Sequence, residues 1–128
     1  MAWPAAYGFT IRVLIADDEP DMRALVGDVL RRAEFDVVEA ADAESALAEW
    51  RARRPDVVIL DHLMPPVTGL HIAEQILGED PTQLIFLFTA MDERDVREPA
   101  EQLGIALCVK KDRVFELPDL LRDYVNRA

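Results

Sequence analysis

The sequence predicts an α/β domain in which a doubly wound, five-stranded parallel sheet carries helices on both faces. Two observations lead to this fold class. Short, continuous apolar runs recur along the chain, and segments with the apolar spacing of amphipathic helices lie between them. Alternating strands and helices favour a parallel sheet, because each helix returns the chain to the edge at which the next strand begins.

Five apolar runs are the predicted strands. Four of them are continuously apolar, as is typical of strands that are buried on both faces: residues 13–16, 57–60, 84–88 and 106–109. A weaker run at residues 35–40 is the fifth candidate. These five runs account for the whole predicted sheet.

Five segments are the predicted helices. Apolar residues recur at intervals of three and four in residues 22–30, 46–50, 72–77 and 117–125. Asp42 is the expected N-cap of the second helix, and the third is expected to follow Gly69. The stretch 92–103 completes the alternation. Pro99 in its interior removes one backbone hydrogen bond, which predicts a helix that is short or bent.

Length and composition are those of one globular domain. The chain has 128 residues, of which 51% are hydrophobic and 30% charged, so it is long enough to bury a core and too apolar to be disordered. We expect residues 1–10 to form an N-terminal extension and residues 11–128 to form the domain. We expect no output domain in the chain.

Net charge and cysteine content exclude several classes of protein. A net charge of −11 repels nucleic-acid phosphates and anionic membrane surfaces, so direct binding to either is not expected. The longest strongly apolar stretch, 84–88, is too short to span a bilayer, and the first ten residues lack the basic start of a signal peptide. The single cysteine, Cys108, cannot form an internal disulfide. We therefore expect a cytoplasmic protein.

Polar residues follow four of the predicted strands. In open α/β sheets the carboxyl ends of the strands meet at the edge where ligands bind. The residues at these ends are therefore expected to form one site, and they are Asp17 and Asp18, Asp61, Thr89 and Ala90, and Lys110 or Lys111.

The three carboxylates of this set indicate a metal site. Brought together, Asp17, Asp18 and Asp61 would repel one another unless a cation lay among them, and Mg²⁺ (or Mn²⁺) takes such oxygen ligands. Taken alone, Asp17 and Asp18 are better explained as the start of a helix before Pro20.

Asp61 is a candidate nucleophile. It has no obvious capping role, because Pro65 and Pro66 delay the next helix. A carboxylate can capture a phosphoryl group as an acyl phosphate if a metal and a cationic side chain neutralise the charge. Lys111 offers the cation and Thr89 a hydroxyl donor, although both residue types at strand ends are usually solvated surface.

In combination these residues resemble a known family. The motifs, in order, are Asp17-Asp18-Glu19-Pro20, Asp61-x-x-Met64-Pro65-x-x-x-Gly69, Phe88-Thr89-Ala90 and Lys111. At these separations they resemble the receiver domains of bacterial response regulators, the CheY-like proteins of two-component signalling and phosphorelays, over roughly residues 11–125. The resemblance implies a flavodoxin-like (βα)5 fold and a phosphoprotein modified in a Mg²⁺-dependent reaction.

The resemblance also implies the metal ligands. Asp18 matches the direct ligand, and Asp17 matches the carboxylate that reaches the metal largely through water. Asp61 and the backbone carbonyl of Leu63 complete the set.

The same resemblance implies the phosphoryl pocket. Asp61 matches the phosphoacceptor, Thr89 the hydroxyl that binds the phosphoryl group, and Lys111 the lysine that pairs with it, while the small Ala90 leaves room for the group. Lys110 competes with Lys111, but the spacing from Gly104 selects Lys111.

Four residues near the implied site concern switching and lifetime, and two of them, Asp112 and Cys108, depart from the family. Asp112 follows Lys111 where proline is frequent, so a trans peptide is expected there. Cys108 stands where an aromatic switch residue is usual, so we expect the signal to pass through the segment from Met91 to residue 103. Leu63 and Met91 flank the approach of water and predict a long-lived acyl phosphate.

The leading functional interpretation is signalling, in which a histidine kinase or phosphotransfer protein donates to Asp61 and the modified domain changes its protein partners. Such a domain is not an enzyme on other substrates. Two alternatives are a phosphorylation-independent interaction module and, ranked lower, a haloacid-dehalogenase-type phosphohydrolase, in which an aspartate would stand where Leu63 does. The sequence leaves open the downstream partner and whether the chain forms a homodimer.

Overall fold

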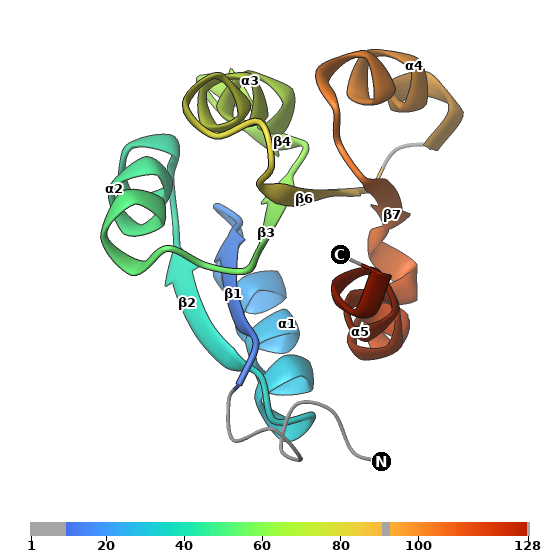
Figure 1. Ribbon diagram of the computed structural model, residues 1–128. Helices are drawn as coiled ribbons and strands as arrows, with labels where there is room; N and C mark the ends of the chain where they lie inside the picture. Colours follow the sequence, from blue (N-terminus) through green and yellow to red (C-terminus); the bar gives the residue numbers. More distant parts are fainter. Residues whose placement is uncertain (1–9, 91–92, 128) are drawn as a thin grey trace.

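A single parallel sheet forms the centre of the protein in the computed structural model, which describes residues 10–90 and 93–127 (Figure 1). Within these residues the sheet has five strands in the order β2-β1-β3-β6-β7. The strands are β1 (Arg12–Ala16), β2 (Asp36–Ala40), β3 (Val57–Asp61), β6 (Leu84–Thr89) and β7 (Leu107–Lys110). All neighbouring strands run parallel, so the predicted fold class is confirmed.

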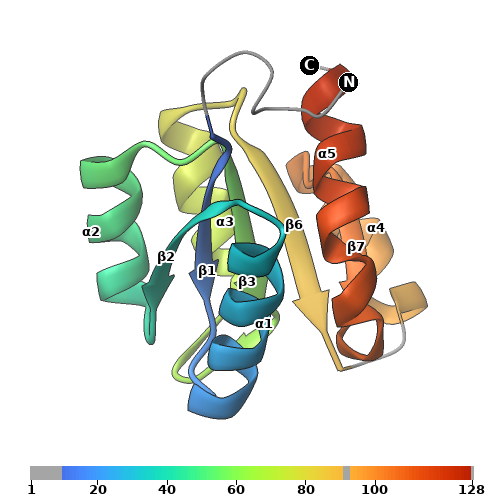
Figure 2. The ribbon, with the colours of Figure 1, turned by 90° about the horizontal axis from the view of Figure 1, so that it is seen from below.

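Helices cover both faces of the sheet. Over the same residues the helices are α1 (Pro20–Arg32), α2 (Ala43–Arg53), α3 (Gly69–Glu79), α4 (Glu93–Leu103) and α5 (Leu117–Arg127). Figures 1 and 2 show α1 and α5 on one face and α2, α3 and α4 on the other.

Local sequence signals account for the helix starts. Pro20 is the first residue of α1, where its missing N–H costs no hydrogen bond. The Asp42 side chain accepts a hydrogen bond from the Ser45 N–H at 2.7 Å, which confirms Asp42 as the N-cap of α2. Thr68 caps α3, which begins at Gly69.

Alternating strand residues build two separate layers of core. In β1, Leu14 packs with the helices of one face, whereas Val13 and Ile15 pack with α1 and α5 on the other. Residues of β3 divide in the same way, which explains why both strands are continuously apolar.

Three local features concern the connections of the sheet and the helix that contains Pro99. A two-stranded hairpin, β4 (Leu63–Met64) and β5 (Val67–Thr68), follows β3, and its Pro65–Pro66 bond is cis. The connection before α5 is a 3₁₀ helix, η2 (Lys111–Glu116), and its Lys111–Asp112 bond is trans as expected. Pro99 does not shorten α4, which has 11 residues like α2 and α3.

Residues 1–9 lie outside the described residues, and with them nearly all of the expected N-terminal extension. Among the described helices, none combines the length and apolarity needed to cross a membrane.

Candidate functional site

The strand register brings the predicted site residues to one edge. Ala16 of β1 pairs with Leu60 of β3, so the residues that follow, Asp17 and Asp61, lie beside each other. Asp61 in turn pairs with Phe88, which precedes Thr89. The arrows of β1 and β6 point toward this edge, which is seen in Figure 2 where α1 begins. Parallel pairing thus places residues that are 44 positions apart in one site.

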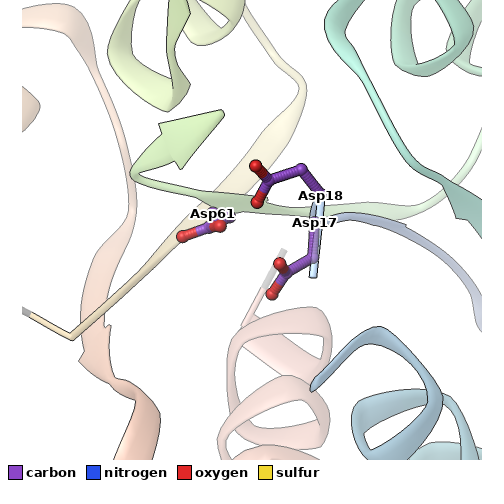
Figure 3. Close-up of side chains that lie close together, drawn as sticks. All are labelled: Asp17, Asp18 and Asp61. Atoms are coloured by element: carbon purple, nitrogen blue, oxygen red, sulfur yellow. The ribbon is translucent and has the colours of Figure 1, made fainter. Parts of the chain in front are cut away.

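Asp17, Asp18 and Asp61 form an acidic cluster there (Figure 3). One carboxylate oxygen of each residue lies within 4.8 Å of the others. Asp17 and Asp61 are buried, whereas Asp18 is exposed. Two of the three negative charges are therefore largely removed from water, where their mutual repulsion is least screened.

Lys111 provides a positive charge to this cluster. Its Nζ lies 3.1 Å from Asp61 Oδ1 and 3.4 Å from Asp17 Oδ2. Burial alone would lower the pKa of Lys111, but the charges of Asp17 and Asp61 outweigh it and raise that pKa. Lys111 is therefore firmly cationic, and its ammonium contacts both buried aspartates of the cluster.

The pKa of Asp61 is shifted in the opposite direction from that of a typical ion-paired carboxyl. Burial, and then the negative charge of Asp17, raise the pKa of Asp61 to about 6, although Lys111 offsets part of the effect. The ionised form of Asp61 is therefore disfavoured in this environment, and an additional positive charge nearby would stabilise it.

A pocket opens above Asp61. It has a volume of about 210 Å³. Its lining includes every predicted site residue except Asp17, together with Glu19 and His62; the predicted residues are Asp18, Asp61, Leu63, Thr89, Ala90 and Lys111. Thr89 is fully buried at the end of β6, Ala90 is exposed, and the Leu63 side chain is largely exposed. The pocket is therefore open to solvent above a buried carboxylate.

His62 and Glu19 line this pocket, and the sequence analysis gave neither of them a role in the site. His62 is buried, its Nδ1 has no hydrogen-bond partner among the described residues, and burial lowers its pKa. The signal for both residues was adjacency, since each directly follows a predicted site aspartate.

Asp17 shows that the cluster fits a divalent cation. Its Oδ1 accepts a hydrogen bond from the Glu19 N–H at 2.9 Å, whereas its buried Oδ2 has no hydrogen-bond partner in the described part of the chain. The Lys111 ammonium forms an ion pair with Oδ2 at 3.4 Å. An under-satisfied carboxylate oxygen among three acidic groups suits a hard cation with oxygen ligands.

Of the residues expected to affect switching and lifetime, the structure describes Cys108 but not Met91. Met91 lies outside the described residues, so its place relative to the pocket is not described. Cys108 is partly buried on β7, in a cavity of about 250 Å³ that it shares with residues of α4 such as Arg97 and Ala100.

Comparisons with known proteins show which family this chain resembles. The family described as response regulator receiver domain matches residues 13–122. The probable transcriptional regulatory protein TcrX of Mycobacterium tuberculosis is 38% identical over 87 residues, which cover 68% of this chain and 37% of TcrX. The chemotaxis protein CheY of Listeria monocytogenes is 31% identical over 111 residues, which cover 83% of this chain and 93% of CheY.

A solved structure is similar in fold as well. The Vibrio cholerae chemotaxis protein CheY4 superposes with a TM-score of 0.81 and 26% identity, covering 93% of this chain and 98% of CheY4. The chain thus spans little more than a third of TcrX but nearly the whole length of the two chemotaxis proteins.

Proposed function

Because the chain belongs to the response regulator receiver domain family, we propose that it accepts a phosphoryl group on Asp61 from a phosphohistidine, in a reaction that requires Mg²⁺ (or Mn²⁺). The observation that carries this proposal is the environment of Asp61. Its buried carboxylate lies at the floor of an open pocket, 3.1 Å from the Lys111 ammonium and beside the Asp17-Asp18 pair.

The transfer is a displacement at phosphorus. An Asp61 carboxylate oxygen attacks the phosphorus atom, a P–O bond forms as the P–N bond to the donor imidazole breaks, and the imidazole leaves with the electron pair and takes up a proton. Lys111 and the Thr89 hydroxyl bind the phosphoryl oxygens as charge builds up on them. Ala90 leaves room for the group.

The proposed metal ligands are Asp18 directly, Asp17 largely through water, Asp61, and the Leu63 backbone carbonyl. A bound Mg²⁺ would neutralise the phosphoryl oxygens and the clustered carboxylates. The chain's own contribution is to hold these oxygens within reach of one another.

Exposed apolar side chains, one of which lines the pocket, support docking of a protein donor. The exposed large hydrophobic residues in the described part of the chain are Leu25, Leu63 and Phe115. Leu63 lies two residues after Asp61, Phe115 lies in η2 four residues after Lys111, and Leu25 lies on α1. We propose a histidine kinase or a histidine phosphotransfer protein as this donor.

The output is a change of protein partners rather than chemistry on another substrate. We propose a cytoplasmic signalling domain that catalyses only its own phosphorylation and dephosphorylation. A difference of about 1–3 kcal/mol between the two states is sufficient to switch binding to a downstream protein.

Intact-mass measurement after incubation with acetyl phosphate and Mg²⁺ tests the function. The wild type should gain one phosphoryl group, and so should the control variant Asp28→Asn, which removes an exposed carboxylate on α1. Asp61→Ala, and the wild type in EDTA, should gain none. A phosphorylation-independent module would stay unmodified, and a phosphohydrolase would turn over acetyl phosphate without slowing at one equivalent.

A further inference from the structure

Arg23 connects the main chain of Asp17 to strand β2. Its Nη1 donates a hydrogen bond of 2.7 Å to the Asp17 main-chain carbonyl oxygen, and its Nε lies 3.5 Å from Glu39 Oε1. The guanidinium is largely buried, with its side chain 20% exposed. One planar group thus holds two acceptors on different elements in fixed relative positions.

The same strand holds Asp17 from its other side. The Asp17 N–H donates to the Ala40 carbonyl oxygen at 3.1 Å, and Ala40 directly follows Glu39. Both main-chain polar groups of Asp17 are therefore tied, directly or through Arg23, to the end of β2.

The carbonyl that Arg23 contacts belongs to the peptide unit between Asp17 and Asp18. Because a peptide unit is planar, fixing its oxygen also fixes the direction in which the Asp18 backbone leaves it. We propose that Arg23 is a positioning residue of the metal site, which orients the Asp17-Asp18 carboxylates toward Asp61 without contacting the cation. This inference rests on the proposed function.

Arg31 supplies a matched control. Its Nη2 lies 2.9 Å from Glu39 Oε2, the second oxygen of the carboxylate that pairs with Arg23. Arg23 and Arg31 therefore each make one ion pair with Glu39, but it is Arg23 that donates a hydrogen bond to the Asp17 carbonyl. A substitution of either residue removes an ion pair, and only one removes the contact with the site.

Calorimetric titration with MgCl₂ tests the inference on the wild type, Arg23→Met and Arg31→Met. Groups that orient metal ligands typically contribute about 10–100-fold in metal affinity, so the dissociation constant should rise at least about tenfold in Arg23→Met. It should change less than about twofold in Arg31→Met, where only a surface ion pair is lost. Arg23→Lys should be intermediate, because an ammonium lacks the planar fork that holds both acceptors.

Phosphorylation by acetyl phosphate adds a second readout. In Arg23→Met the Mg²⁺ concentration for half-maximal rate should rise while the rate at saturating Mg²⁺ stays close to that of the wild type. A wild type that fails to bind Mg²⁺ would overturn the proposed function. Two other results would overturn the role of Arg23 but not the proposed function. In the first, Arg23→Met and Arg23→Lys bind Mg²⁺ as tightly as the wild type. In the second, Arg31→Met loses as much affinity as Arg23→Met.

Discussion

Gly69 and Asp61 approach each other so closely that a Cβ atom on residue 69 would lie 2.3 Å from the Asp61 main-chain carbonyl oxygen. Gly69 is the first residue of α3, and its N–H donates a 2.8 Å hydrogen bond to the carbonyl of His62. The start of α3 is therefore packed directly against the backbone that carries the proposed phosphoacceptor. This contact gives a physical reason for glycine at the end of the Asp61-x-x-Met64-Pro65-x-x-x-Gly69 motif.

Gly69→Ala should destabilise the protein and disturb Asp61. The new methyl group meets backbone rather than a flexible side chain, so we expect a loss of about 1–3 kcal/mol in the free energy of unfolding, measured by urea denaturation. Gly78→Ala is the control in the same helix, because a Cβ there meets nothing within 4 Å. It should stabilise the protein by about 0.5–1 kcal/mol. Equal effects of both substitutions would contradict the close approach.

Stability of the metal-free protein should fall as the pH rises from 4 to 6. The pKa of Asp61 is raised to about 6 in the folded state, whereas an unfolded aspartate titrates near about 3.9. Between these values the folded state binds more protons than the unfolded state, so the contribution of Asp61 is lost as the pH rises through this window. The loss should be on the order of 1–3 kcal/mol.

Urea denaturation in EDTA at several pH values checks this, with Asp61→Asn as the comparison. The difference in unfolding free energy between the wild type and Asp61→Asn isolates the contribution of residue 61 from that of the other acidic groups. This difference should change between pH 4 and 6 and stay constant from pH 7 to 8. Parallel curves over the whole range would show that the Asp61 pKa is not raised.

Mg²⁺ should raise the melting temperature, because the acidic cluster exists only in the folded state. Saturation at 100 times the dissociation constant corresponds to about 2.7 kcal/mol. Asp18→Asn should melt at a slightly higher temperature than the wild type in EDTA. Because Asp18 is exposed, the gain in the free energy of unfolding should be less than about 1 kcal/mol. The melting temperature of this variant should also respond less to Mg²⁺. A lower melting temperature of Asp18→Asn in EDTA would show that the cluster is not repulsive.

The acyl phosphate should be long-lived if Leu63 and Met91 restrict the attacking water. Leu63 lines the pocket with an exposed side chain that offers no hydrogen bond to that water. Leu63→Asn/Met91→Glu should therefore hydrolyse about 10–100 times faster, measured as the decay of the phosphorylated mass in Mg²⁺ buffer. Leu63→Ala separates shielding from water orientation, since it removes bulk without adding a polar group. Equal decay in all three proteins would contradict the prediction.

Phosphorylation should change amide hydrogen exchange in α4 more than in other parts of the chain outside the site. Cys108 cannot provide the ring movement that an aromatic side chain would, so the signal is expected to leave through the β6–α4 connection and α4. Asp61→Ala treated with acetyl phosphate and Mg²⁺ is the control. Unchanged protection in residues 93–103 of the phosphorylated wild type would exclude this route.

The sequence by itself determined the five strands of the parallel sheet and the residues at their carboxyl ends. Continuous apolar runs identified the strands to within about a residue, because strands buried on both faces leave no room for polar side chains. The same runs placed Asp17, Asp61 and Thr89 at strand ends. Strands of two residues, as in β4 and β5, are too short to show a period, so the hairpin was not predicted.

Contacts between distant segments were decided only by the tertiary structure. Arg23 and Glu39 are ordinary charged residues in the sequence, and the contacts of Arg23 with Asp17 and Glu39 depend on how α1 packs against β2. The raised pKa of Asp61 likewise depends on its burial and on the closeness of Asp17. Strand periodicity fixes which residues end at one edge, but the distances between their side chains are set by register and packing across the whole sheet.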